Sequence, residues 1–308
     1  MLNRFLSATL AGLAWAAPVP AALAEGVIER AARTGELVLT GPTETPSILS
    51  LDASGQPEGY AAEVASRIAA DVTTAVGRPV RLRFVADSNP VTVFANLANG
   101  KADLVCGVAF SWERDLFADF SLPIAVSGLN LLAPDGRFDG SAAGLAGRPI
   151  GVLKHSLGET HLRGFQPAAK VAPFKSLDAA LDALEAGDVD GVIGDSVLLE
   201  AMLRGRGLSG YSITPDAPYQ SYGITCLLPQ NDSAFRDLVN LSIARLLQGY
   251  LDGETEAVAA VDRWIGPGSS IDVPRDQIQS WFEATMMGLE AIRPLPPDTP
   301  GSSEDMPK

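Results

Sequence analysis

Apolar and polar positions along the first third of the chain predict strands and helices in turn. The apolar run at 37–40 predicts a buried strand. From 60 to 76 an apolar residue recurs at every fourth position, which predicts an amphipathic helix. Residues 80–86 alternate apolar and charged, as a half-exposed strand does, and 91–99 predict a second helix. The apolar run at 102–108 completes a β-α-β-α-β set, whose strands should open on a crevice at their C-terminal ends.

Part of this pattern is repeated later in the chain. Residues 97–107, LANGKADLVCG, match residues 184–194, LEAGDVDGVIG, with Leu, Gly, Asp, Val and Gly in the same register. Both stretches describe the end of a helix, a glycine stop, a short strand and a glycine at the end of that strand. The period is too long for a solenoid, so we predict two similar α/β lobes.

The N-terminal residues have a different character. Arg4 is followed by a run rich in Ala and Leu and by Ala-Leu-Ala at 22–24, which predicts a secretory signal peptide over 1–24. Pro18 and Pro20 argue against a membrane span there. Loss of Arg4 leaves 22 of the 23 Lys and Arg against 37 Asp and Glu, a net charge of −15. This balance disfavours nucleic acid and anionic membrane surfaces as partners.

Cysteine and histidine are scarce. Cys106 and Cys226 are the only cysteines, and in an oxidising compartment they could pair. Both lie in apolar, strand-like runs, which favours two separate buried thiols, and this is our prediction. His155 and His161 are the only histidines, and no third ligand accompanies them at a metal-binding spacing, so we expect no metal site and no cofactor.

The stretch 107–123, GVAFSWERDLFADFSLP, carries the clearest candidate chemistry. Arg114 follows the predicted buried strand, in a helical turn that Ser111 could cap, and its guanidinium matches a carboxylate. An arbitrary arginine more often pairs with an acidic neighbour on the surface. The order strand, Gly, Ser, two residues, Arg, then DFSLP at 119–123 resembles the signature of the family 3 periplasmic solute-binding proteins, the polar amino acid receptors of ABC importers.

The resemblance implies the α/β, two-lobed fold of type II periplasmic binding proteins. Each lobe would be a mostly parallel sheet flanked by helices, and two hinge strands would join the lobes. We expect the first lobe to comprise residues 25–126 and 221–268, and the second lobe residues 127–220. Residues 269–293 would add a C-terminal helical extension, and 294–308, rich in Pro, Gly and Ser, would be disordered.

The same resemblance suggests a ligand site between the lobes. In the family, the arginine that matches Arg114 holds the α-carboxylate of the ligand. The internal repeat puts Asp195 at the corresponding place in the second lobe, so closing the lobes would offer a cation and an anion to one zwitterion. Alternatively, Asp195 caps the helix that begins after it. Further expected contacts are Ser111, the backbone N–H of Ala109, Ser156, His155 and Glu44.

Two of these positions depart from the family pattern. Ala109 stands where the family often has Ser or Thr, so a hydroxyl is missing. His155 stands in the turn where the family has Gly, next to Lys154. It is either a solvated turn residue or a ligand contact, and in the second case the pair favours an acidic ligand.

These patterns predict a monomeric periplasmic binding protein, not an enzyme, that closes on an amino acid or a related carboxylate and presents it to an ABC permease. One alternative is an orphan receptor or scaffold that acts through a protein partner. Another is a periplasmic dehydratase-type lyase that uses His155, Glu44 or Asp195 for acid-base work. The sequence has no nucleophile elbow and no phosphate loop in favour of an enzyme.

Overall fold

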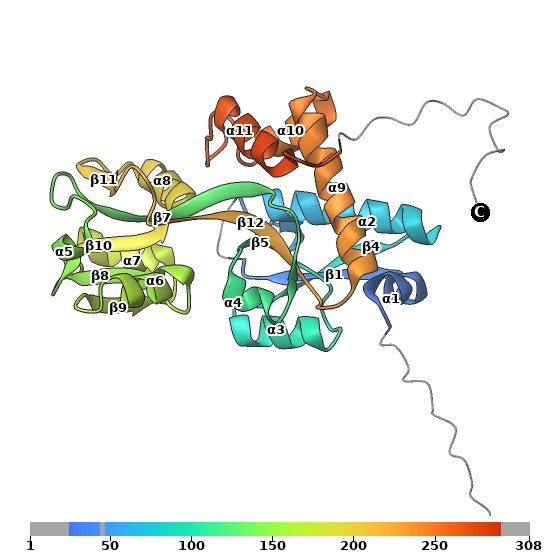
Figure 1. Ribbon diagram of the computed structural model, residues 1–308, viewed down its shortest axis with the longest axis horizontal. Helices are drawn as coiled ribbons and strands as arrows, with labels where there is room; N and C mark the ends of the chain where they lie inside the picture. Colours follow the sequence, from blue (N-terminus) through green and yellow to red (C-terminus); the bar gives the residue numbers. More distant parts are fainter. Residues whose placement is uncertain (1–24, 44–46, 291–308) are drawn as a thin grey trace, which may run out of the picture.

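The chain folds into two α/β lobes joined by two long strands (Figure 1). The computed structural model describes residues 25–43 and 47–290. The predicted signal peptide, Glu44 and the predicted tail at 294–308 lie outside these residues. Within the described ranges, no helix combines the length and the apolar character needed to cross a bilayer.

The first lobe contains the predicted β-α-β-α-β set. Strand β1 pairs in parallel with β4, and Leu39 of β1 also bridges to Leu104, just before β5. Residues of β4 alternate between exposed and partly buried, as its sequence predicts. Tyr60 at the start of α2 is buried, and its hydroxyl donates to the carbonyl of Ile124. The elements are α1 (Val27–Thr34), β1 (Glu36–Gly41), β2 (Ser50–Leu51), β3 (Pro57–Glu58), α2 (Tyr60–Val76), β4 (Arg81–Ala86), α3 (Pro90–Ala98), β5 (Val105–Ala109), α4 (Trp112–Asp115) and β6 (Asp119–Phe120).

Two antiparallel strands connect the lobes. Strands β7 (Ala125–Pro134) and β12 (Gln220–Leu228) pair from Ala125↔Ile224 to Leu129↔Gln220. Beyond this ladder β12 pairs with β5 of the first lobe, and β7 pairs with β10 of the second. One mixed sheet, ordered β5-β12-β7-β10-β8-β9, therefore runs through the connection into both lobes.

In the second lobe, β8, β9 and β10 are parallel, and helices cover the sheet. After β12 the chain returns to the first lobe, where α9 packs against α2. The two-lobed fold is thus as expected, although the exact residues that bound each lobe stay a prediction. The remaining elements are α5 (Ala142–Leu145), β8 (Pro149–Leu153), α6 (Leu157–Phe165), β9 (Lys170–Phe174), α7 (Leu177–Glu185), β10 (Gly191–Asp195), α8 (Ser196–Gly205), β11 (Tyr211–Thr214), α9 (Ser233–Leu251), α10 (Thr255–Asp262) and α11 (Arg275–Met286).

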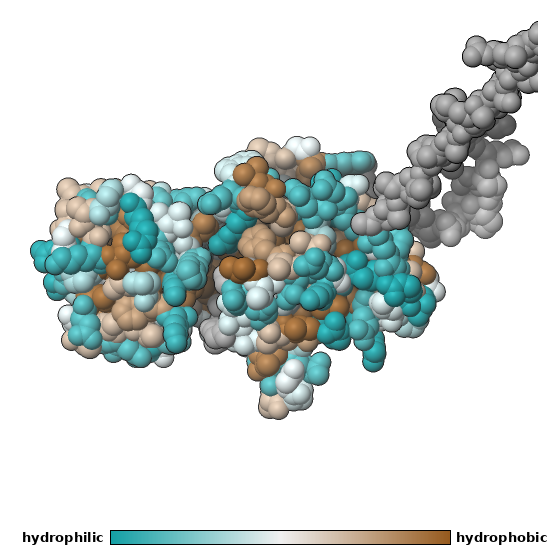
Figure 2. Space-filling model, turned by 90° about the horizontal axis from the view of Figure 1, so that it is seen from below, coloured by the Kyte–Doolittle hydropathy of each residue, from teal (hydrophilic) through white to brown (hydrophobic). Residues whose placement is uncertain are grey.

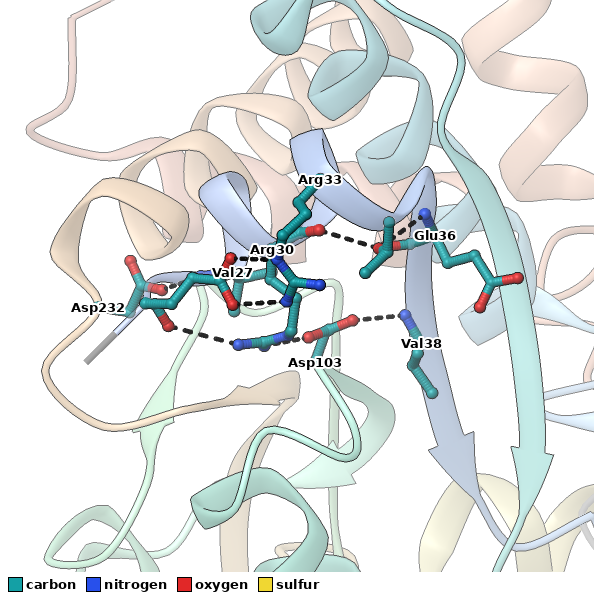
Figure 3. Close-up of polar contacts among 9 residues, drawn as sticks. Val27, Arg30, Arg33, Glu36, Val38, Asp103 and Asp232 are labelled. Carbon is teal, nitrogen blue, oxygen red and sulfur yellow. Dashed lines mark hydrogen bonds and ion pairs between the residues drawn. The ribbon is translucent and has the colours of Figure 1, made fainter.

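The internal repeat has a structural counterpart, because the aspartate of each copy holds an arginine. In the first lobe the buried Asp103 carboxylate pairs with Arg30 of α1 and accepts the backbone N–H of Val38 at 2.6 Å (Figure 3). In the second lobe Asp190 pairs with Arg137 and Arg148. Each carboxylate thereby fixes the start of the strand, β5 or β10, whose far end carries a candidate site residue.

The two cysteines correct one prediction. Cys106 and Cys226 form a disulfide, with their Cα atoms 3.9 Å apart. They face each other across the antiparallel pair β5 and β12, although 120 residues separate them in the sequence. The prediction of two separate thiols was therefore wrong. Apolar surroundings are compatible with both free thiols and a disulfide, and the return of β12 to β5 is what brings the two sulfurs together.

His161 lies in an aromatic cluster of the second lobe. Its ring stacks on Phe165 and on Tyr219, with centroids 5.3 and 5.9 Å apart. Among the described residues, neither His161 Nε2 nor the Tyr219 hydroxyl finds a hydrogen-bond partner, and both atoms are buried. Burial lowers the pKa of His161 from its ordinary 6.5 and raises that of Tyr219 to about 12.

This cluster predicts a loss of stability in mild acid. Because the pKa of His161 is lower in the folded chain, the unfolded chain binds its proton more readily, and the free energy of unfolding should fall as the pH drops below about 6.5. His161→Phe should flatten this slope between about pH 7.5 and 5.5 in urea denaturation series. The exposed His155 provides the control, since His155→Gln should keep the slope. An unchanged slope in His161→Phe would contradict the assignment.

Candidate functional site

Arg114 occupies α4, a single helical turn directly after β5. The Arg114 side chain is partly buried. Among the described residues, no acceptor takes a hydrogen bond from its guanidinium; the nearby influences on its pKa are burial, which lowers it, and the charge of Glu113, which raises it. A guanidinium withdrawn from water without a partner carries an unrecovered desolvation cost. The alternative for Arg114, a surface ion pair with an acidic neighbour, is therefore not formed among the described residues.

The other first-lobe residues lie on the same short stretch. Ala109 ends β5 and faces Ile224 of β12 across the ladder. Ser111 precedes the α4 turn as its N-cap residue, but its hydroxyl makes no capping bond, so the predicted cap is absent. The hydroxyl of Ser111 and the guanidinium of Arg114 are thus three residues apart, and neither has a hydrogen-bond partner among the described residues.

Asp195 ends β10 in the second lobe and is the N-cap of α8. Its Oδ1 accepts the backbone N–H of Leu198 at 3.1 Å, and its Oδ2 accepts the hydroxyl of Tyr222 at 2.8 Å. Burial raises the pKa of Asp195, while bonds from Ser127 and from these donors oppose the rise. The capping alternative is therefore realised. Asp195 also joins the second lobe to the connecting strand β12 through Tyr222.

Ser156 and His155 form the turn before α6. The Ser156 hydroxyl accepts the backbone N–H of Glu159 at 3.2 Å, and the Glu159 carboxylate accepts the backbone N–H of His155 at 2.7 Å. This reciprocal pair is a variant of the capping box, in which the carboxylate reaches one residue further back than usual. Ser156 can still donate its own hydroxyl proton. His155 has φ 60° and an exposed side chain, which agrees with the solvated-turn alternative.

The loop after β1 reaches this region although Glu44 itself is not described. Ile48 packs so closely on β5 that a Cβ at Gly107 would lie 2.7 Å from its side chain. Gly107 has φ 84°, a conformation that glycine adopts without strain. Ser47, the residue before Ile48, is also held, because its carbonyl accepts the N–H of Tyr60 at 2.7 Å. The end of this loop is therefore held against the strand that leads to Arg114.

The predicted site residues fall into two groups, one on each lobe. Ala109, Ser111 and Arg114 stand at the C-terminal end of β5. His155 and Ser156 follow β8, and Asp195 ends the neighbouring parallel strand β10. Seen from below, the surface is hollowed between the two lobes (Figure 2).

Sequence reasoning missed Tyr222, and it left open whether Trp112 lines the cleft or packs on the lobe surface. Tyr222 read as one more residue of an apolar strand, and only the ladder of β12 with β7 shows that its hydroxyl can reach Asp195. Trp112 is 79% exposed beside Arg114, and its ring meets Phe110 edge-on with centroids 4.8 Å apart. Packing alone does not explain a tryptophan side chain as exposed as this one.

The family model of the bacterial extracellular solute-binding proteins, family 3, matches residues 37–266. The chain belongs to this family. The match begins within β1 and ends after α10, so it spans both lobes and stops before α11. Family 3 membership makes the chain a solute-binding protein, and the arginine and aspartate at its strand ends lie within the matched region.

The chain is similar in sequence to one named relative and similar in fold to solved binding proteins. A probable histidine-binding protein of Neisseria gonorrhoeae is 25% identical over 219 residues, which are 68% of this chain and 76% of that protein. The cysteine-binding protein of Campylobacter jejuni superposes with a TM-score of 0.69 at 17% identity, over 82% of this chain and 98% of its own. An ancestral amino acid-binding protein, a precursor of cyclohexadienyl dehydratase, superposes with a TM-score of 0.66 at 17% identity, over 78% of this chain and 100% of its own.

Proposed function

We propose that the mature chain is a periplasmic receptor that binds an amino acid or a related carboxylate between its lobes. The observation that carries this proposal is the partly buried Arg114 guanidinium, for which no described residue provides an acceptor. A bidentate carboxylate would supply two charge-assisted hydrogen bonds and offset the desolvation of the cation. The Ser111 hydroxyl and the N–H of Ala109 would add donors to the same carboxylate.

Asp195 completes the proposed site from the second lobe. A carboxylate already accepting from Leu198 and Tyr222 has lone pairs left for an ammonium group, since each oxygen can accept more than one hydrogen bond. The Ser156 hydroxyl can donate from the same lobe, and Glu44 would reach the ligand from the loop after β1. His155 has the weakest support in this set because its side chain is exposed.

Closure would follow ligand binding. Because the two charged groups come from different lobes, one zwitterion can satisfy both only if the lobes approach, which couples binding to hinge rotation. In this proposal the signal peptide directs the chain to the periplasm, and the closed monomer presents its ligand to an ABC permease. The lobes of the proposal are residues 25–126 with 221–268, and residues 127–220.

A thermal-shift series tests the proposed function. The mature chain would be heated with each of the twenty common L-amino acids, including the histidine and cysteine that similar proteins are named for. For each amino acid that raises the melting temperature, the amine without its carboxylate and the acid without its amino group would follow. A specific ligand at 100 times its Kd stabilises by about 2.7 kcal/mol. We expect the amine to lose this effect. Retention by the amine would contradict the role of Arg114.

The same series separates the two alternatives. An orphan receptor or scaffold should show no stabilisation by any amino acid or carboxylate. The likeness to a dehydratase precursor motivates a lyase, and turnover of a prephenate-like substrate, followed by absorbance, would support it. Binding without turnover would favour the receptor.

A further inference from the structure

The C-terminal strap, which we define as residues 269–286, lies beyond the stretch that matches the family and is packed into the first lobe. Helix α11 within it contacts α9 and the connecting strand β7. The ring of Phe282 meets that of Tyr250 on α9 edge-on, with centroids 5.2 Å apart. Four strap side chains are buried in the main core of the first lobe, namely Ile271, Val273, Ile278 and Phe282.

The strap also contacts the second lobe through α8. The Arg204 guanidinium on α8 donates a hydrogen bond to the carbonyl of Ile271. Three apolar residues of α8 are partly buried against the same core that holds the strap, namely Val197, Leu198 and Ala201. The strap therefore ties a helix of the second lobe to the body of the first, in addition to the two connecting strands.

The strap lies on the opposite side of the connection from α4 and from the start of α6. In Figure 1, α11 and α8 lie above β7 and β12, whereas α4, which carries Arg114, and α6, which follows Ser156, lie below them. A rotation about the connecting strands that brings α4 and the start of α6 together must draw α8 away from the strap. The hydrogen bond from Arg204 to the Ile271 carbonyl and the packing of Ala201 against the first-lobe core would then be lost.

We propose that the C-terminal strap is a brace behind the hinge that opposes closure of the lobes and so lowers the affinity for the ligand. The inference rests on the proposed function in one respect, that the lobes close on a ligand. Contacts made only in the open arrangement favour that arrangement, and a ligand that binds the closed one must overcome them. Weakening the brace raises the closed fraction, and the apparent Kd falls by the same factor.

Two variants test the brace. Arg204→Ala removes the hydrogen bond to the Ile271 carbonyl from an exposed side chain, so the fold should persist. Ala201→Phe adds bulk between α8 and the first lobe. Glu200→Gln is the matched control, because Glu200 pairs with Arg204 within α8, at 2.9 Å, and makes no bond to the strap. A melting temperature within a few degrees of the wild type would verify that each variant folds.

Small-angle X-ray scattering without ligand gives the first readout. We expect a smaller radius of gyration for the double variant Arg204→Ala, Ala201→Phe than for the wild type, and no change for Glu200→Gln. A radius unchanged or increased in the double variant would overturn the brace. This measurement needs no ligand, so it tests whether the strap opposes closure even if the proposed function fails.

Calorimetric titration with L-histidine and L-cysteine gives the second readout. We expect about a 3- to 10-fold tighter Kd for Arg204→Ala, from the loss of one charge-assisted hydrogen bond in the open form. An unchanged or weaker Kd would overturn the brace. If neither probe binds the wild type or any variant, amino acid binding by these two probes is refuted, and the scattering result stands alone.

Discussion

Replacing Arg114 by alanine is expected to weaken the binding of a carboxylate ligand by about 30-fold or more. Removing one partner from a buried, hydrogen-bonded charge pair costs about 2–5 kcal/mol, which corresponds to a loss of this size. The unliganded variant should melt at the wild-type temperature or above it. This expectation follows because the Arg114 guanidinium is desolvated and gains no hydrogen bond from the described residues. Titration calorimetry and thermal denaturation measure the two quantities.

Two companion variants sharpen this prediction. Arg114→Lys keeps the charge but loses the planar fork, so its affinity should lie between those of the wild type and the alanine variant. Arg236→Ala removes a first-lobe arginine that already pairs with Asp119 at 3.4 Å, and it should leave the affinity unchanged. Equal binding by the wild type and Arg114→Ala would show that the ligand carboxylate lies elsewhere.

Loss of the disulfide should produce the largest change in stability. The free energy of unfolding of the double variant Cys106→Ala, Cys226→Ala is expected to be about 4 kcal/mol lower than that of the oxidised wild type. The cross-link closes a loop of 120 residues, and the chain-entropy model gives about 4.7 kcal/mol for a loop of 100 residues, with measured values of about 2–5. Urea denaturation in the absence of reductant provides the measurement.

Reductant supplies the control for that experiment. Dithiothreitol should lower the stability of the wild type toward that of the double variant and leave the double variant unaffected. If the oxidised wild type and the double variant unfold at the same urea concentration, the two sulfurs are not cross-linked in solution.

Local pattern was enough to predict most elements of the first lobe. Four-residue periodicity predicted α2, alternation predicted β4, and Asn99-Gly100 marked the end of α3, because each of these signals depends only on neighbouring residues. The repeat went further. It related Asp195 to the position of Arg114 because both lobes use the same helix, glycine, strand sequence, and both copies of its aspartate proved to hold an arginine.

Contacts between distant segments were beyond the reach of such patterns. The disulfide depends on β12 pairing with β5, and the bond from Tyr222 to Asp195 depends on β12 lying beside β7. The Ser156 hydroxyl was assigned to a ligand without its partner Glu159, although Ser and Glu three residues apart are visible in the sequence. The packing of α11 was likewise hidden, since an amphipathic helix shows which face is buried but not what buries it.

The cross-link between β5 and β12 has a mechanical consequence for the hinge. It fixes Cys226, two residues beyond the end of the Ala125↔Ile224 to Leu129↔Gln220 ladder, to the strand that leads to Arg114. The first-lobe end of β12 therefore cannot slide, and relative rotation of the lobes must be absorbed as twist within five residue pairs. In the proposed closure the connection would twist about a first-lobe end that the disulfide holds fixed, and Arg114 would approach the second lobe along an arc about that end.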